Sequence, residues 1–194
     1  MPPGNLHMTA LEITHSLTAN EIDALVQQML PGVPEIADYT LTHRARLVKP
    51  MLSFDAQALA LSYLPAAGEP SRDAEEDSYT YHHLRRDLLT NAQATGVKVA
   101  SRYVIPSAHL TIGRFITKRD FETEDGEVDH ARVEKLIAAI EEVNQWLRAE
   151  YWPTAEGIRA GGEWFVGQEK GLEFRKGALW YGGGGKTVHL GKGF

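Results

Sequence analysis

Apolar residues recur at helical spacing in three stretches of the sequence. The first stretch follows Thr18 and Glu21, which form the pattern of a capping box, and it ends at Pro31 and Gly32. The second covers residues 81 to about 94 and precedes a turn at Gly96. The third follows an acidic loop at 122–129, and its apolar positions are Val133, Leu136, Ile137, Ile140, Val143 and Leu147. The pattern predicts three helices, and the apolar face of the third must cover a sheet.

Alternation and β-forming residues predict the strands. Residues 6–14 are predicted as the first strand, since Leu6, Met8 and Ala10 oppose His7, Thr9 and Leu11. Residues 44–54 and 57–64 predict a hairpin around Asp55, in which Pro50 makes the first strand an edge or kinked strand. Residues 103–116 are predicted as a further strand.

Glycines punctuate the C-terminal part of the chain, which begins at Gly162. Short segments with aromatic residues at 164–166, 172–174 and 178–181 predict two or three short strands there. Residues 182–186 do not form a P-loop, because its first glycine would fall at Trp180, so we interpret them as a flexible turn. Residues 65–77 are small and charged and contain Pro and Gly, which predicts a mobile loop between two halves. We interpret the two halves as similar lobes with one cleft between them.

Composition narrows the classes of function. The chain has 194 residues, enough for one domain or two closely packed lobes, and a net charge of −6. That charge argues against sequence-independent binding of long nucleic acid. The absence of cysteine excludes disulfides and cysteine nucleophiles. No apolar run is long enough for a bilayer and no signal peptide is evident, so we expect a cytoplasmic or nuclear protein without membrane contact. The sequence leaves the oligomeric state open.

Two segments of the chain share a His-x-Thr pattern. They are His7-Met8-Thr9 and His109-Leu110-Thr111, and each lies on a predicted strand with an apolar residue in its middle. Because side chains alternate along a strand, each segment presents an imidazole and a hydroxyl on one face. Two such strands adjacent in a sheet would form a four-residue cluster. One triplet could arise by chance, but these two occupy equivalent places in the two half-chains.

Paired imidazoles and hydroxyls suit the cleavage of a phosphodiester. One imidazole takes a proton from the attacking oxygen and the other gives a proton to the leaving oxygen. Histidine can supply both forms near neutral pH. Threonine hydroxyls can donate to the non-bridging phosphate oxygens as negative charge builds up, a role that a metal ion would otherwise fill. The sequence therefore predicts His7, Thr9, His109 and Thr111 as catalytic residues, with no metal and no cofactor.

The segments 5–15 (NLHMTALEITH) and 106–115 (PSAHLTIGRF) resemble the 2H phosphoesterase superfamily, which includes LigT-like RNA 2′,3′-cyclic phosphodiesterases, and in particular its uncharacterised fungal members. The resemblance covers nearly the whole chain. It implies an α+β fold in which two antiparallel sheets with outer helices flank a central cleft. It also implies one bilobal domain over 1–194, with lobe one at about 1–64 plus later elements and lobe two at about 78–194. Since only six residues precede His7, we expect the first lobe to lack its N-terminal strand.

Three further residues are candidates for substrate binding. Arg114 should point to the opposite strand face from Thr111 unless a bulge at Gly113 re-aims it, and a structural salt bridge is the alternative role. Tyr81 could stack on a base, or it could serve helix capping and lobe packing. Trp164 could line a base pocket, although aromatic residues on C-terminal strands more often fill a core. Arg44 and Arg46 could supply positive potential for a nucleotide, but solvated strand charges are the commoner explanation, and we interpret them so.

The expected function is hydrolysis of a 2′,3′-cyclic nucleotide or of a cyclic phosphate at an RNA 3′ end, so the partner is a small nucleotide or an RNA end. Cleavage of a 2′,5′-phosphodiester and trimming of RNA ends would use the same four residues, and the sequence does not separate these reactions. The alternative is a nucleotide-binding module of the same fold that has lost turnover. A metal-dependent hydrolase using His7, His109 and acidic residues is less well supported, because neither His-x-His nor His-Glu-x-x-His occurs in the sequence. The sequence does not assign the acid and base roles to either histidine.

Overall fold

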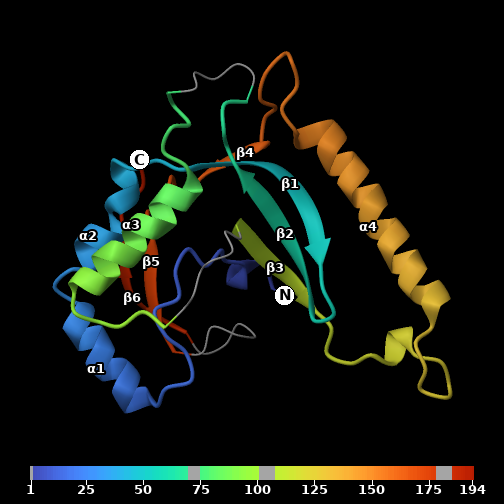
Figure 1. The fold of residues 1–194 in the computed structure, drawn as a ribbon, viewed down its shortest axis with the longest axis horizontal. Helices are drawn as coiled ribbons and strands as arrows, with labels where there is room; N and C mark the ends of the chain where they lie inside the picture. The colour runs from blue at the N-terminus through green and yellow to red at the C-terminus, as the bar shows by residue number, and fades with distance from the viewer. Residues whose placement is uncertain (1, 70–74, 101–107, 178–184) are drawn as a thin grey trace.

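The computed structural model of the chain describes residues 2–69, 75–100, 108–177 and 185–194. These residues form a mixed α+β structure, as the sequence predicts (Figure 1). The helices are α1 (Ala19–Met29), α2 (Val33–Ala37), α3 (Tyr81–Ala94) and α4 (His130–Tyr151). The strands are β1 (Arg46–Phe54), β2 (Ala58–Pro65), β3 (Ala108–Arg114), β4 (Glu163–Phe165), β5 (Glu173–Lys176) and β6 (Lys186–Leu190). Short 3-10 turns lie at Pro3–Asn5, Tyr39–Leu41 and Arg119–Phe121.

The three predicted helices are confirmed, together with the local signals that begin and end them. The Thr18 hydroxyl accepts a hydrogen bond from the Glu21 backbone N–H, and the Glu21 carboxylate accepts one from the Thr18 N–H, which completes the capping box of α1. Gly96, with a φ of 86°, follows α3 in a left-handed turn. The short helix α2 is a finding that the sequence did not predict, because prolines in residues 31–34 favoured a turn. Pro34 lies in its first turn, where the lack of an N–H costs nothing.

Four antiparallel strands form the main sheet, in the order β3-β2-β1-β4. The predicted hairpin of β1 and β2 is confirmed, and so is the kink at Pro50. Val48 faces Leu64 while Met51 faces Ser62, so β1 carries one additional residue at Lys49 and Pro50. Strand β4 pairs with β1 only over Arg46, Leu47 and Val48, and β1 is therefore an edge strand beyond the kink.

A second, two-stranded sheet consists of β5 and β6. Its lead-in is joined to α2 by a hydrogen bond from the Leu172 N–H to the Ala37 carbonyl. Two of the predicted C-terminal strands, near 164–166 and 172–174, are confirmed by β4 and β5, while 178–181 lies outside the described residues. The prediction missed β6, which begins at Lys186, in residues interpreted as a turn. Residues 70–74, part of the predicted mobile loop, and 103–107, part of the predicted strand around His109, also lie outside the described residues.

The predicted strand at 6–14 is wrong as a continuous element. Only Met8 makes a strand-type bridge, and the chain bends at Ala10. The physical reason lies in its apolar residues, which serve two different cores. Met8 packs against the cluster built by α3 and the sheet, whereas Ile13 packs against the cluster between α1, α2 and α3. A straight strand along the edge of β3 could not reach both.

The main sheet has one apolar face and one polar face. Leu47, Leu52, Leu61, Tyr63 and Leu110 share the apolar face through their cross-strand pairing. The buried residues Tyr81, Leu84 and Leu88 of α3 pack near one end of this face. Near the other end, α4 covers it as predicted and leaves a cavity of about 390 Å³ lined by Leu52, Leu61 and Trp146, among others. The opposite, polar face carries Ser53, Ser62 and His109.

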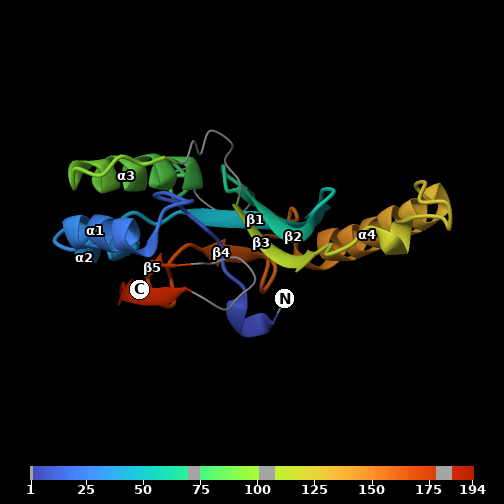
Figure 2. The same ribbon diagram turned by 90° about the horizontal axis from the view of Figure 1, so that it is seen from below.

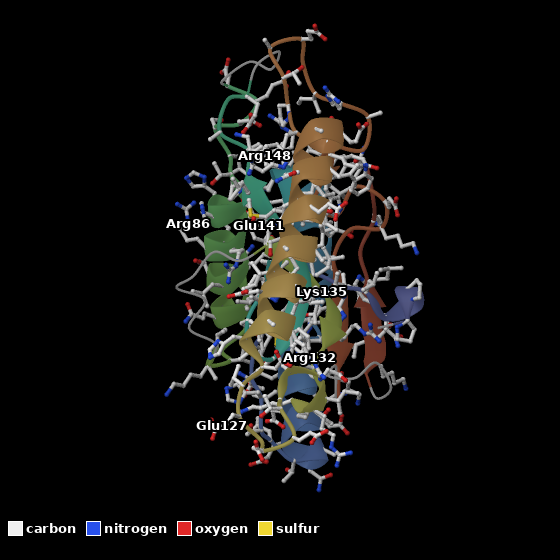
Figure 3. The ribbon with its side chains drawn as sticks, turned by 90° about the vertical axis from the view of Figure 1, so that its right-hand side faces the viewer. Arg86, Glu127, Arg132, Lys135, Glu141 and Arg148 are labelled. Atoms are coloured by element: carbon white, nitrogen blue, oxygen red, sulfur yellow. The ribbon has the colours of Figure 1, made fainter. Side chains whose placement is uncertain are left out.

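The elements are arranged on two sides of the main sheet. In Figure 1 α1, α2, α3 and the β5–β6 sheet lie to the left of the main sheet and α4 lies to the right. Seen from below, α3 lies on one side of α1 and α2, and β5 and β6 lie on the other (Figure 2). Figure 3 looks onto the outer side of α4 and shows Arg132, Lys135, Glu141 and Arg148 along this helix. No described helix is both long and apolar enough to cross a membrane.

Candidate active site

The two His-x-Thr segments lie side by side at the outer edge of β3. Met8 forms an antiparallel bridge with Leu110, the middle residue of the second segment. Residues that are directly opposite in an antiparallel pair share a face, and their neighbours along each strand share the other face. The bridge therefore sets His7 opposite Thr111 and Thr9 opposite His109, on the polar side of the sheet. The structure thus brings the four predicted residues to one edge.

A bulge in β3 places Arg114 on the same face as His109. Gly113 faces Leu59 and Thr111 faces Ala60, so β3 carries one additional residue, Ile112, at this point of the register. Beyond the bulge Arg114 faces Ala58, which lies two residues from Ala60 and therefore on the same face. In a regular strand Arg114 would point to the opposite face from Thr111. The bulge is centred on Ile112 and Gly113, where the sequence had suggested that one could re-aim this arginine.

Two serine hydroxyls extend the polar face beside His109. Ser62 is the cross-strand partner of His109, and its Oγ lies 2.6 Å from the Oγ of Ser53. The Ser53 hydroxyl donates to the Ala60 carbonyl at 3.3 Å, which uses its one proton. The Ser62 hydroxyl must therefore be the donor to Ser53. Sequence reasoning missed this pair, although the alternation of β2 places Ser62 on the polar side.

Asp55 is a carboxylate at the hairpin end of this face. Its Oδ1 accepts hydrogen bonds from the backbone N–H groups of Gln57 at 2.7 Å and Ala58 at 2.8 Å. These two bonds hold the pKa of Asp55 below its ordinary value, and the positive charges of Arg114 and His109 lower it further. The electrostatic field of one carboxylate thus reaches both Arg114 and His109.

His7 is exposed to solvent, and one of its ring nitrogens is already engaged. The Nδ1 of His7 lies 2.9 Å from the carbonyl oxygen of Asn5. A carbonyl can only accept, so Nδ1 carries the proton and donates it. In the neutral ring, Nε2 then holds the lone pair that can accept a proton. The 3-10 turn Pro3–Asn5 therefore sets the tautomer of the first histidine.

The structure does not bring Tyr81 and Trp164 to the histidines. Tyr81 is completely buried in the core on the apolar face, so the prediction that it stacks on a substrate base is wrong: no base can reach its ring. Trp164 faces Leu47 across the β1–β4 pair and packs edge-on against Tyr63, with ring centroids 5.6 Å apart. Both contacts lie on the apolar face. Of the three candidate binding residues, only Arg114 shares a face with His109.

A buried ion cluster lies at the other end of the polar face. Arg46 is 3 % exposed and donates to both carboxylate oxygens of Asp77, at 3.0 and 2.5 Å. It also pairs with Glu69 at 3.5 Å and with Glu163 at 3.3 Å. The interpretation of Arg46 as a solvated strand charge is therefore wrong. Sequence reasoning missed its partners because Glu69 and Asp77 lie in a segment whose composition predicts a loop.

Neither metal-ligating groups among the described residues nor comparisons with known proteins narrow the possible functions of the site further. Within the described ranges, no three His, Asp or Glu side chains come together in a way that could hold a metal ion. In comparisons with known proteins, no family model matches this chain, and no curated protein and no solved structure matches it significantly.

Proposed function

We propose that the chain is a metal-independent phosphodiesterase that hydrolyses 2′,3′-cyclic nucleotides or cyclic-phosphate RNA ends by two-histidine acid–base catalysis. The observation that carries this proposal is the bridge between Met8 and Leu110, which brings two matched imidazole–hydroxyl pairs to one edge of a sheet. Chance resemblance between two distant triplets gives no reason for them to meet in the fold. A role in phosphodiester chemistry gives one.

The reaction needs two proton transfers and stabilisation of negative charge on phosphorus. The neutral histidine takes a proton from water, the water oxygen forms a bond to phosphorus, and the bond from phosphorus to one ribose oxygen breaks. The protonated histidine gives its proton to that leaving oxygen. Thr9 and Thr111 are placed to donate hydrogen bonds to the non-bridging oxygens, where charge develops. Arg114 contributes to substrate binding on the same face.

The proposal includes the two-lobed 2H fold that the sequence motifs suggest. In that interpretation the polar face of the main sheet forms one wall of the cleft. Strands from both halves of the chain share the main sheet, since β1 and β2 belong to the first half and β3 belongs to the second. The short segment around Met8 supports the proposal, because it places the first His-x-Thr motif beside the second at the edge of β3.

The test is hydrolysis of the four nucleoside 2′,3′-cyclic phosphates in excess EDTA, followed by chromatography of the products. We expect the wild-type chain to turn over at least one of them, and His7→Ala or His109→Ala to lower kcat by several orders of magnitude. Thr9→Ala and Thr111→Ala should cost roughly ten- to a thousandfold.

His15→Ala is the matched control, because His15 is an exposed histidine that hydrogen-bonds to its neighbour Ser16. This variant should retain wild-type turnover. Equal rates in wild type and the His7 or His109 variants would reject the mechanism. A folded wild-type protein that binds cyclic nucleotides without hydrolysing them would identify the alternative, a nucleotide-binding module.

A further inference from the structure

Three polar residues follow one another along the polar face of β3. They are His109, Thr111 and, beyond the bulge, Arg114. The bulge inserts one additional residue, Ile112, into the pairing of β3 with β2. What it changes is the direction of the arginine, which faces the same side as the proposed catalytic residues. A cation held at a fixed distance from a phosphate-cleaving pair points to a second negative group on the substrate.

The spacing between Thr111 and Arg114 fits one nucleotide step. From Thr111 across the bulge to Arg114, the register advances by two residues on the partner strand, from Ala60 to Ala58. Two strand residues cover about 7 Å at 3.3–3.4 Å each. This length is comparable to the separation of consecutive phosphates along a nucleic-acid strand, which are joined by six backbone bonds. A phosphate held near Thr111 would therefore leave the adjacent phosphate near Arg114.

The guanidinium group has enough donors for such a contact. Arg114 lies in the field of Asp55, whose Oδ1 is already occupied by the N–H groups of Gln57 and Ala58. A guanidinium carries five N–H donors in a planar fork, so it can serve a carboxylate and a phosphate together. Attraction to Asp55 then keeps Arg114 on the polar face. The positive charge of Arg114 lies between the Asp55 carboxylate and the phosphate and offsets the repulsion between these two negative groups.

We propose that Arg114 binds the phosphate next to the one that is cleaved, so that the preferred substrate is a cyclic phosphate with a second phosphate one nucleotide upstream. This inference rests on the proposed function and narrows its substrate class. A cyclic-phosphate RNA end carries that phosphate in its last internucleotide link, and a cyclic nucleotide carries it only when its 5′ oxygen is phosphorylated. A bare nucleoside 2′,3′-cyclic phosphate lacks it.

The test compares kcat/KM for three substrates: uridine 2′,3′-cyclic phosphate, the same nucleotide with a 5′-phosphate, and a uridine dinucleotide that ends in a 2′,3′-cyclic phosphate. Wild type should prefer each substrate with a second phosphate by about ten- to a hundredfold, the usual effect of a hydrogen bond to a charged group. In Arg114→Gln the ratio should fall to about one, and Arg114→Lys should give an intermediate ratio, because lysine keeps the charge but loses the fork. Added salt should reduce the wild-type ratio.

Arg119→Gln is the matched control, because Arg119 is an exposed arginine that lies just beyond β3 and outside the site. It should keep the wild-type ratio. Wild-type turnover with equal kcat/KM for all three substrates would overturn this inference and leave the proposed function intact. No turnover of any substrate would overturn both. If Arg114→Gln does not fold, the wild-type ratio and the lysine variant decide the question.

Discussion

At the scale of single residues, Arg46 is a cation buried among carboxylates. Its side chain is 2 % exposed, and its partners Glu69 and Asp77 are 7 % and 3 % exposed. A charged group that is buried loses its hydration, and an ion pair offsets this loss only when its geometry is good. Here the guanidinium of Arg46 makes two hydrogen bonds to the carboxylate of Asp77. The two carboxylates also bind the backbone just after β2, since the Gly68 N–H donates to Asp77 and the Ala67 N–H donates to Glu69.

Arg46→Met should therefore lower the free energy of unfolding by about 3–5 kcal/mol, because it leaves buried carboxylates without their cation. Arg132→Met is the matched control, since Arg132 pairs with Asp129 at the surface with 57 % of its side chain exposed. That change should cost less than about 1 kcal/mol. Urea denaturation of the two variants measures the difference. Similar losses in both would show that burial gives Arg46 no special role.

A second residue-scale cluster makes stability sensitive to high pH. Tyr79 donates to Asp87 at 2.9 Å, and Tyr39 donates to the same oxygen at 3.3 Å. Burial, the hydrogen bond to Asp87 and the charge of Asp87 raise the pKa of Tyr79 well above its ordinary value of 10.0. For Asp87 burial raises the pKa, but hydrogen bonds from Arg86 and Tyr79 outweigh it and leave the pKa lowered. The two shifts have opposite consequences for the dependence of stability on pH.

The raised pKa of Tyr79 means that its stabilisation is complete below pH 10.0 and is lost as pH rises above that value, because the unfolded chain then ionises first. Asp87 contributes above its ordinary pKa and loses its contribution as pH falls through the lowered one. Asp87→Asn should bring the titration of Tyr79, followed by tyrosinate absorbance, closer to pH 10.0. Asp23→Asn, a change to an exposed aspartate on α1, should leave it where it is in the wild type. An unchanged titration in Asp87→Asn would contradict the assignment.

At the scale of elements, α4 completes an edge of the main sheet that β4 leaves open. Beyond the kink at Pro50, the Asn144 side chain accepts from the Leu52 N–H at 2.6 Å and donates to the Leu52 carbonyl at 2.9 Å. Trp152 donates to the Pro50 carbonyl at 2.9 Å. A helix side chain thus takes the place of a neighbouring strand, which is one way of protecting an exposed edge.

Asn144→Leu should destabilise the fold by about 1–3 kcal/mol, because it leaves the N–H and C=O of Leu52 without these partners. The more specific measurement is amide hydrogen exchange, which should accelerate at Leu52. Gln145→Leu is the control, since Gln145 is exposed on the same helix and should change neither quantity much. If exchange at Leu52 were equally slow in both variants, α4 would not protect the edge.

Elements were predictable from sequence where local signals decide them. The capping box of α1, the apolar stripe of α4 and the turn at Asp55 are such signals, since each depends on residues close in the chain. The strand at 6–14 was mispredicted because its β-forming residues are divided between two cores, which only the tertiary structure determines. Helix α2 was missed for the same reason, since its partners α3, β5 and β6 are distant in the chain. Strand β6 was missed because the glycines just before it in the sequence favour a turn.

At the scale of the whole molecule, the candidate site depends on one long-range contact. The sequence could nominate His7, Thr9, His109 and Thr111, because a repeated motif is visible without a fold. It could not place Arg114, because the direction of this side chain depends on a bulge in the pairing with β2. Nor could it exclude Tyr81, whose burial depends on α3 packing against the sheet. The motif residues could thus be predicted from the sequence. The sheet face on which each neighbouring side chain lies could not be predicted.

The contact between the two motif segments can be tested without any assay of activity. The sequence has no cysteine, so Met8→Cys with Leu110→Cys introduces the only two thiols. Opposite residues of an antiparallel pair have Cα atoms about 4.5–5.5 Å apart, within the range of about 4.4–6.8 Å that a disulfide spans. We expect this pair to form an intramolecular disulfide under mild oxidation, detected by mass spectrometry.

Closing a loop of about 100 residues should also stabilise the oxidised protein, by up to about 5 kcal/mol if the bond is unstrained. Met8→Cys with Leu64→Cys is the control. Leu64 lies in β2 and pairs with Val48 of β1, so it should not cross-link to position 8. Equal cross-linking in both pairs would mean that the N-terminal segment does not stay beside β3. Hydrolysis of cyclic phosphates by the cross-linked Met8–Leu110 variant would show that the two histidine segments remain side by side during turnover. The proposed acid–base catalysis requires this arrangement.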